Sequence, residues 1–194
     1  MKKYYIVSGG FDPIHEGHIA MIRASAAESD GVILLLNSDD WLTRKKGTNF
    51  MTFQTRKIIC ENLKGVLEVI AFDDADNSAS DGIRLAREKY PDAELVFANG
   101  GDRTKENIPE TAMCEKCRVV MKFGVGGENK ANASSKILKE YVEKIAKALV
   151  KIGVTDAMVV YGTDCLDEIS ASAETKVAEV RGCLLYTSPS PRDA

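Results

Sequence analysis

Five apolar runs in the first two thirds of the chain have the length and composition of β-strands. The clearest is residues 31–36, Gly-Val-Ile-Leu-Leu-Leu, which is apolar at every position and ends at Asn37. An uninterrupted apolar run of this length is typical of a parallel strand that is covered on both faces. Shorter or mixed runs predict further strands at residues 4–7, 66–72, 94–98 and 118–123.

Helical periodicity separates these apolar runs. Apolar positions at three- and four-residue spacing predict helices that begin near Ile19, that span residues 52–63, and that span residues 83–89 before Pro91. Residues 37–47 are largely polar and are predicted to form a loop. Because strands alternate with helices, we predict an α/β fold with a doubly wound parallel sheet, whose ligands bind outside the carboxyl ends of the strands.

The chain contains two histidines, and both lie in the glycine-containing segment that follows the first predicted strand, residues 8–18. Glycine in a turn between strand and helix lets a ligand approach the backbone closely. The N–H groups and the positive dipole end of the helix favour a phosphate there, and His15 and His18 add donors that titrate near pH 7. This segment is therefore the first candidate phosphate site. In the alternative interpretation, both histidines are surface polar groups at a helix start.

The composition is that of a globular protein and argues against nucleic-acid-binding and membrane proteins. With 44% hydrophobic residues in 194, the chain can build a core, and a net charge of −3 without a basic tract argues against a nucleic-acid partner. No apolar run approaches the roughly 20 residues that span a bilayer, and the first residues do not resemble a signal peptide. We therefore expect a cytoplasmic protein without membrane association.

The number and spacing of the cysteines also favour a cytoplasmic protein. Five cysteines are an odd number without the spacing of a disulfide framework, which favours reduced thiols. Cys114 and Cys117 form a single Cys-x-x-Cys pair, and zinc would need two further ligands that no nearby residue supplies. We interpret the pair as incidental.

Residues 10–18, Gly-Phe-Asp-Pro-Ile-His-Glu-Gly-His, resemble the His-x-Gly-His signature of the cytidylyltransferase-like nucleotidyltransferases. Residues 36–47 and Arg56 are similar to the branch of that family that contains heptose-1-phosphate adenylyltransferase and glycerol-3-phosphate cytidylyltransferase. The resemblance implies a Rossmann-like nucleotidyltransferase fold. It also implies transfer of AMP or CMP from ATP or CTP to a small phosphorylated acceptor, with release of pyrophosphate.

The same resemblance assigns roles to individual residues. It implies that His15, His18 and Lys46 are catalytic, with Lys45 as the alternative to Lys46 and a solvated basic loop as the alternative to both. It places a second phosphate contact at Ser134 and Ser135, a helix start where serine equally suits a plain N-cap. The other implied nucleotide- or phosphate-binding residues are Gly9, Gly10, Phe11, Asp12, Gly17, Gly101, Asp102 and Arg103, of which Asp12 is expected to orient the acceptor or a metal.

Cofactor and partners follow from the same family. Mg²⁺ is expected to accompany the nucleotide, because it pairs with triphosphate oxygens. The similarity of residues 36–47 favours a sugar phosphate as acceptor, while the base, the acceptor and a homodimer stay open. The main rival function is a non-catalytic nucleotide-binding domain, which would also keep the glycine turn.

From residue 142 onward the resemblance changes. Residues 159–170 and 175–180 resemble an internal segment of anthranilate phosphoribosyltransferase, in which the acidic pair that matches Asp167 and Glu168 binds magnesium. The diphosphate-binding loop of that family has no counterpart in this chain. Phosphoribosyltransferase activity is therefore the less favoured function, and this metal pair is expected to be non-functional.

The last twelve residues, 183–194, resemble the translation of an adapter used in sequencing libraries and are expected to form a flexible tail. The predicted organisation is a nucleotidyltransferase domain over residues 1–141, a short extra α/β fragment over residues 142–182, and this tail. A natural fusion and an assembly chimera both fit such an arrangement.

Overall fold

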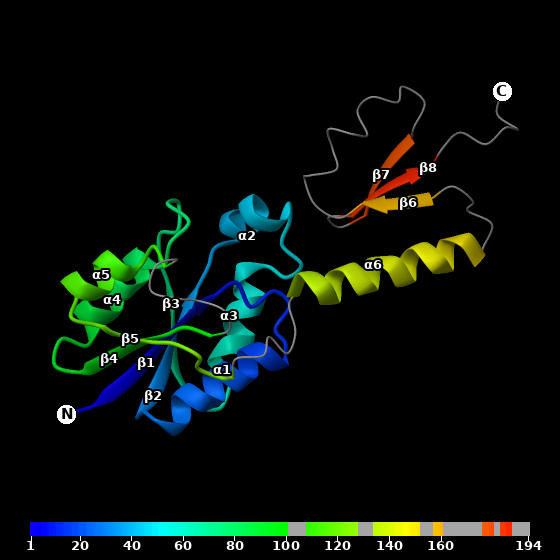
Figure 1. Ribbon diagram of the computed structural model, residues 1–194. Helices are drawn as coiled ribbons and strands as arrows, with labels where there is room; N and C mark the ends of the chain where they lie inside the picture. Colours follow the sequence, from blue (N-terminus) through cyan, green and yellow to red (C-terminus); the bar gives the residue numbers. More distant parts are fainter. Residues whose placement is uncertain (101–107, 128–133, 152–156, 161–175, 181–182, 188–194) are drawn as a thin grey trace, which may run out of the picture. The chain divides into compact units, whose positions relative to one another are not determined.

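The computed structural model describes residues 1–100, 108–127, 134–151, 157–160, 176–180 and 183–187 (Figure 1). The chain divides into two compact units. The first unit comprises Met1–Trp41 and Met51–Ser134, and the second comprises Leu42–Phe50 and Ser135–Ala194.

The first unit is built on a five-stranded parallel sheet with the strand order β3-β2-β1-β4-β5. The chain begins in the centre at β1, builds one half of the sheet outward through β2 and β3, and then returns to β1 to start the other half with β4. This doubly wound order confirms the fold class predicted from the sequence, and it reverses direction between β1 and β4. The strands are β1 (Lys3–Gly9), β2 (Gly31–Leu36), β3 (Val66–Ala71), β4 (Glu94–Ala98) and β5 (Val120–Lys122).

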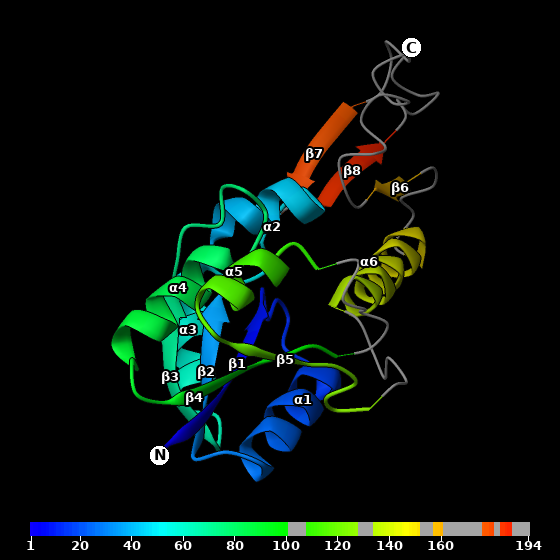
Figure 2. The ribbon, with the colours of Figure 1, turned by 60° about the vertical axis from the view of Figure 1, so that its left-hand side comes forward.

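Helices cover both faces of this sheet (Figures 1 and 2). Val7 of β1 belongs to a buried cluster that includes Ile22 from α1, whereas the neighbouring Ile6 belongs to a second cluster that includes Ile83 from α4. Successive side chains of a strand point to opposite faces, so one strand serves both cores. The first face carries α1 (Glu16–Ala27) and α3 (Phe53–Glu61), and the second carries α4 (Ser80–Lys89) and α5 (Thr111–Lys116).

Strand β2 shows why the apolar pattern predicted this sheet. All six of its residues are buried, and Val32 through Leu36 are fully inaccessible. Full burial of an aliphatic side chain stabilises the folded state by about 1.5–3 kcal/mol. A strand with this composition would lose much of that stabilisation at a solvated face, and the prediction of a strand covered on both sides is confirmed.

Two sequence predictions are corrected by the structure. The polar segment predicted as a loop forms helix α2 (Asp39–Lys46), which has two acidic residues in its first turn and three basic residues in its last. That arrangement complements the helix dipole and favours a helix that has little apolar surface. Helix α1 begins at Glu16 rather than near Ile19, so His18 is a helical residue.

The second unit contains the rest of helix α6 (Ser134–Lys151) and an antiparallel sheet of order β6-β8-β7. Helix α6 continues through residues 141 and 142, where the sequence resemblance changes. The strands are β6 (Ala157–Val160), β7 (Lys176–Val180) and β8 (Cys183–Thr187). Part of the expected flexible tail therefore forms a strand, consistent with the apolar run Cys-Leu-Leu-Tyr at its start, and residues 188–194 lie outside the described residues.

No helix in the described ranges has the length and apolar character needed to cross a membrane.

Candidate functional site

The two histidines lie at the carboxyl edge of the parallel sheet, where the strand order reverses. They follow β1, and the carbonyl of its last residue, Gly9, accepts a hydrogen bond of 3.1 Å from the N–H of Asn37 at the end of β2. In an open parallel sheet the loops on either side of the reversal diverge and leave a crevice for a ligand. The segment singled out from the sequence therefore lies where the fold favours a binding site.

Both imidazole rings cap the start of α1. The Nδ1 atom of His15 accepts the N–H of Gly17 at 3.1 Å, and the Nδ1 atom of His18 accepts the N–H of His15 at 3.3 Å. His15 is the N-cap residue with extended backbone, and the two side chains form a reciprocal capping box. The ring centroids are 3.8 Å apart. Sequence rules missed this cap because they look for Ser, Thr, Asp or Asn at the position.

These hydrogen bonds set the tautomer of both rings. A backbone N–H can only donate, so each Nδ1 atom must be unprotonated, and each neutral ring carries its proton on Nε2. We predict that ¹⁵N spectra of the histidine-labelled chain at neutral pH will show two rings with a protonated Nε2 and an unprotonated Nδ1. A protonated Nδ1 in either ring would contradict the capping geometry. With both Nδ1 atoms used as acceptors, the two adjacent, partly exposed rings each carry an Nε2–H donor.

The turn before the histidines is held in an unusual conformation by buried side chains. Phe11 has a positive φ of 49°, is 2% exposed, and its ring centroid lies 4.9 Å from that of His18. Asp12 is fully buried, and its Oδ1 atom accepts the N–H of Met51 at 2.8 Å. Left-handed backbone in a bulky residue costs about 1–3 kcal/mol and occurs where the surroundings enforce it. Phe11 and Asp12 are both predicted site residues, and through their buried side chains they fix the conformation of the turn.

The loops after β4 and β5 approach the same helix. Gly100 follows Asn99 at the end of β4, and a Cβ atom there would lie 3.1 Å from the Met21 sulfur atom and 3.2 Å from the Val125 carbonyl oxygen. A Cβ atom on Gly126, which has φ +89°, would lie 2.8 Å from the Met21 backbone. Glycine is therefore required at Gly126 in particular, because backbone atoms cannot move aside as a flexible side chain can.

The side chain of Ser134 contacts the histidine segment, and its predicted phosphate contact stays a prediction. Its hydroxyl group is buried and donates a hydrogen bond of 2.9 Å to the carbonyl oxygen of Pro13. This bond ties the first residue of α6 to the histidine segment, so the second predicted phosphate element does begin beside the first. Ser135 is exposed at the next position.

The other predicted site residues are distributed as follows. Gly9, Gly10 and Gly17 belong to the histidine segment, and Lys46 is the last residue of α2, within the second unit. The roles of Lys46 and Lys45 stay predictions. Gly101, Asp102, Arg103, Asp167 and Glu168 lie outside the described residues.

Asp74 and Asn37 are two buried polar residues that were not predicted as site residues, and their contacts stabilise the end of β2. Asp74 is 4% exposed and accepts the N–H of Ser38 at 2.7 Å and the Ser38 hydroxyl at 2.8 Å. The same carboxylate accepts the side-chain amide of Asn37 at 3.2 Å. A buried carboxylate is stabilised by such donors. The available signal was its position, because Asp74 closely follows the strand predicted at residues 66–72.

The described residues contain no group of three or more His, Cys, Asp or Glu side chains arranged to hold a metal ion. Burial raises the pKa of the Cys60 thiol to about 11 and that of the Cys114 thiol to about 12, so both stay protonated at neutral pH. A protonated, buried thiol is a poor nucleophile and a poor metal ligand.

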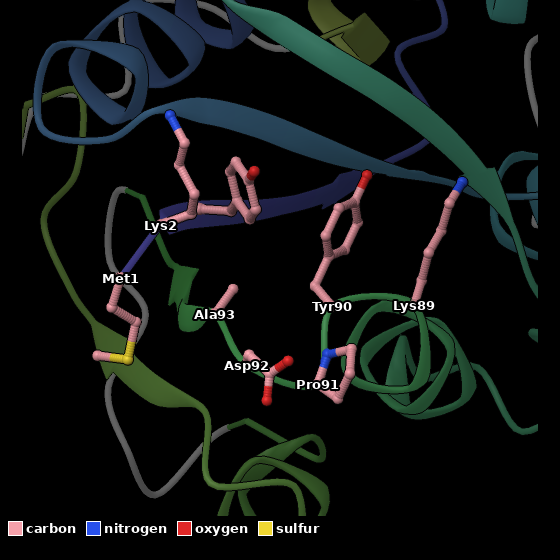
Figure 3. Close-up of a pocket in the computed structure, with 8 residues that line it drawn as sticks. Met1, Lys2, Lys89, Tyr90, Pro91, Asp92 and Ala93 are labelled. Atoms are coloured by element: carbon pink, nitrogen blue, oxygen red, sulfur yellow. The ribbon is translucent and has the colours of Figure 1, made fainter.

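A shallow depression of about 340 Å³ opens at the opposite, amino-terminal edge of the sheet (Figure 3). Its two lysines are each paired, Lys2 with Asp30 at 3.0 Å and Lys89 with Glu68. Tyr90 lines it as well, and its hydroxyl pKa is raised mainly by burial. Neither histidine lies there, and the strand order offers no crevice at this edge. We therefore locate the candidate site at the carboxyl edge.

Comparison with known proteins gives matches over most of the chain. The sequence profile of the cytidylyltransferase-like family matches residues 6–182. The chain is 29% identical over 147 residues to the bifunctional protein HldE of Geobacter metallireducens, covering 74% of this chain and 28% of that protein. It is also 55% identical over 42 residues to the anthranilate phosphoribosyltransferase of Aquifex aeolicus, covering 22% of this chain and 12% of that protein. The chain thus spans less than a third of the length of these curated relatives.

Solved structures share the fold. A bifunctional NMN adenylyltransferase/ADP ribose pyrophosphatase from Francisella tularensis, crystallised with AMP and a manganese ion, superposes with a TM-score of 0.52. The sequence identity is 13%, and the match covers 74% of this chain and 42% of that one. At this level of identity the likeness concerns the fold.

Proposed function

Because the chain belongs to the cytidylyltransferase-like family, we propose that it is a nucleotidyltransferase that moves AMP or CMP from a nucleoside triphosphate to a small phosphorylated acceptor. One observation carries the proposal. Two imidazole rings, each fixed through Nδ1 by a backbone N–H, lie beside a glycine turn where the strand order of the sheet reverses. This arrangement offers preorganised donors to a triphosphate.

The proposed reaction needs little covalent help from the protein. A phosphate oxygen of the acceptor attacks the α-phosphorus of the nucleotide, the new P–O bond forms, and the bond to the bridging oxygen breaks so that pyrophosphate leaves with the electron pair. An ionised phosphate is already a nucleophile, so positioning and charge stabilisation supply most of the rate. The Nε2–H groups of His15 and His18 are the donors that we assign to the α-phosphate and the leaving pyrophosphate.

Magnesium would enter with the triphosphate and neutralise part of its charge. Asp12 is the carboxylate of the histidine segment, and its Oδ1 atom already accepts the N–H of Met51. The residues present therefore suit an ion that is held mostly by nucleotide oxygens and water. Lys46 is our candidate for a further cation on the phosphates, and Lys45 is the alternative.

For the acceptor we propose a sugar phosphate. The support is the similarity of residues 36–47 to the heptose-1-phosphate adenylyltransferase branch and the identity to HldE proteins over 74% of this chain. The segment similar to anthranilate phosphoribosyltransferase covers 12% of its relative, which is too little to supply that enzyme's substrate sites. A cytoplasmic setting remains part of the proposal.

The decisive test measures pyrophosphate released by the full chain with magnesium. ATP and CTP are offered separately against sugar 1-phosphates, glycerol 3-phosphate and phosphopantetheine, with reactions lacking acceptor as the control. We expect release with one nucleotide and a sugar phosphate, which would identify the base and the acceptor together. Nucleotide binding without acceptor-dependent release across this panel would contradict the proposal and favour the binding-only rival.

A further inference from the structure

Arg56 is a fully buried arginine that lies directly beneath the candidate site. It is 0% exposed, although it comes from α3, a surface helix of the sheet's first face. Its Nη1 atom donates to the carbonyl oxygen of Gly10 at 2.7 Å and to that of Asn37 at 2.9 Å. One nitrogen atom therefore joins the turn after β1 to the end of β2.

The rest of the guanidinium group completes the connection. Nε donates to the carbonyl oxygen of Met51 at 3.1 Å, and Nη2 donates to Oδ1 of Asp39 at 2.6 Å. Asp12 accepts the N–H of the same Met51 at 2.8 Å. Residue 51 is thus held from both sides, by Arg56 through its carbonyl and by Asp12 through its N–H. The planar fork of arginine is suited to such fixed, multiple bonds.

The bond to Gly10 has a direct consequence for the phosphate-binding turn. In a trans peptide the C=O of one residue and the N–H of the next point in opposite directions. Because the Gly10 carbonyl is directed at Arg56, the N–H of Phe11 is directed away from it. The conformation of residues 9–12, and with it the path of the chain into His15, is therefore set by a side chain 46 residues away along the sequence from Gly10.

We propose that Arg56 is a positioning residue of the nucleotide site: it holds the Gly10 turn and the histidine cap in the geometry that transfer requires. This role rests on the proposed function. Arg56 is fully buried, and its three guanidinium nitrogen atoms are bonded to backbone carbonyls and to Asp39. It therefore acts on the phosphates through the backbone of the turn and through the capped histidines. A shift of about 1 Å in such a constellation can reduce a rate by about 100-fold.

A second arginine provides a matched control. Arg87 on α4 also bonds to several carbonyls, donating to those of Cys117 at 2.8 Å and Ala93 at 2.8 Å. It also donates to the Tyr90 and Pro91 carbonyls at the amino-terminal edge shown in Figure 3, away from the histidines. Loss of its fork removes a comparable structural support without touching the turn.

The experiment compares Arg56→Lys with Arg87→Lys in the full chain. Lysine keeps the charge beside Asp39 but cannot reach the three carbonyls with one ammonium group. We expect Arg56→Lys to lower kcat about 100-fold with a smaller change in KM, and to shift both histidine ring ¹⁵N resonances. Arg87→Lys should leave kcat within twofold of the parent value and should leave both histidine resonances unshifted. This holds even if the variant unfolds at a lower urea concentration.

The two readouts separate this proposal from the proposed function. A folded Arg56→Lys variant with kcat within twofold of the parent chain and unshifted histidine resonances would overturn the positioning role. If the parent chain releases no pyrophosphate, the ring spectra still decide: shifted histidine resonances in Arg56→Lys, and none in Arg87→Lys, would support the positioning role. An Arg56→Met variant, when it folds, lacks both the fork and the charge and should lose at least as much activity as Arg56→Lys. Equal losses in the two variants would assign the effect to the fork, because the charge that lysine keeps would then have made no difference.

Discussion

Replacing His18 with alanine is expected to lower kcat for pyrophosphate release by about 10³-fold, which corresponds to about 4 kcal/mol of transition-state stabilisation. The Nδ1 atom of this ring accepts the His15 N–H at 3.3 Å, which leaves the ring proton on Nε2, and we assign this Nε2–H to the ligand. Removing one preorganised donor from a site where charge develops typically costs 10²–10³-fold. The larger figure applies because alanine also removes the cap that holds His15. Steady-state kinetics with the identified substrate pair measures the effect.

Two further variants divide the two functions of the His18 ring. In His18→Asn the amide oxygen can take the place of Nδ1 and keep the cap, but nothing replaces Nε2–H. In His18→Gln the longer side chain can present an amide N–H near the Nε2 position. We expect the asparagine variant to be as stable as the parent and nearly as inactive as His18→Ala, and the glutamine variant to recover part of the rate. Near-normal turnover by His18→Ala would reject the proposed mechanism.

The sheet could be predicted because burial on both faces imposes a simple pattern. Residues 31–36 were predicted as a strand, and β2 has those bounds, since every position is buried and no polar residue interrupts the run. Helix α2 could not be predicted in this way. Its stability comes from charges placed at its two ends and not from an apolar stripe, so its sequence shows no hydrophobic periodicity that would predict a helix.

Part of the candidate site could be located from the sequence, and part of it could not. The histidine segment and the glycine turn are local in sequence, so their place between the first strand and the first helix could be predicted from the residues, while their part in catalysis stays a prediction. Arg56 acts through contacts with residues as far away as Gly10, and a pattern of residue types does not reveal such a partner. A signal did exist, because Arg56 lies three residues after Phe53 and four before Cys60, on the buried face of α3. A charge on that face requires a partner inside the protein.

A single methyl group on Gly126 is expected to destabilise the first unit by about 3 kcal/mol. Alanine at φ +89° has a strained backbone, which costs about 1–2 kcal/mol. Its Cβ atom would also lie 2.8 Å from the Met21 backbone, and overpacking of this kind adds about 1–3 kcal/mol. Met21 lies one turn after His18 on the same side of α1, so the displaced helix should disturb the site as well. Urea unfolding followed by circular dichroism measures the change in the free energy of unfolding.

Gly124 supplies the matched control for the steric part of this effect. Its φ of +68° is also left-handed, but a Cβ atom there would meet no atom within 4 Å. Gly124→Ala should therefore cost about 1 kcal/mol, the conformational part alone. The difference between the two variants isolates the contact with α1. Equal losses in Gly126→Ala and Gly124→Ala would mean that the β5 loop does not press on the helix that carries the histidines, and that the close approach of Gly126 to Met21 has no energetic consequence.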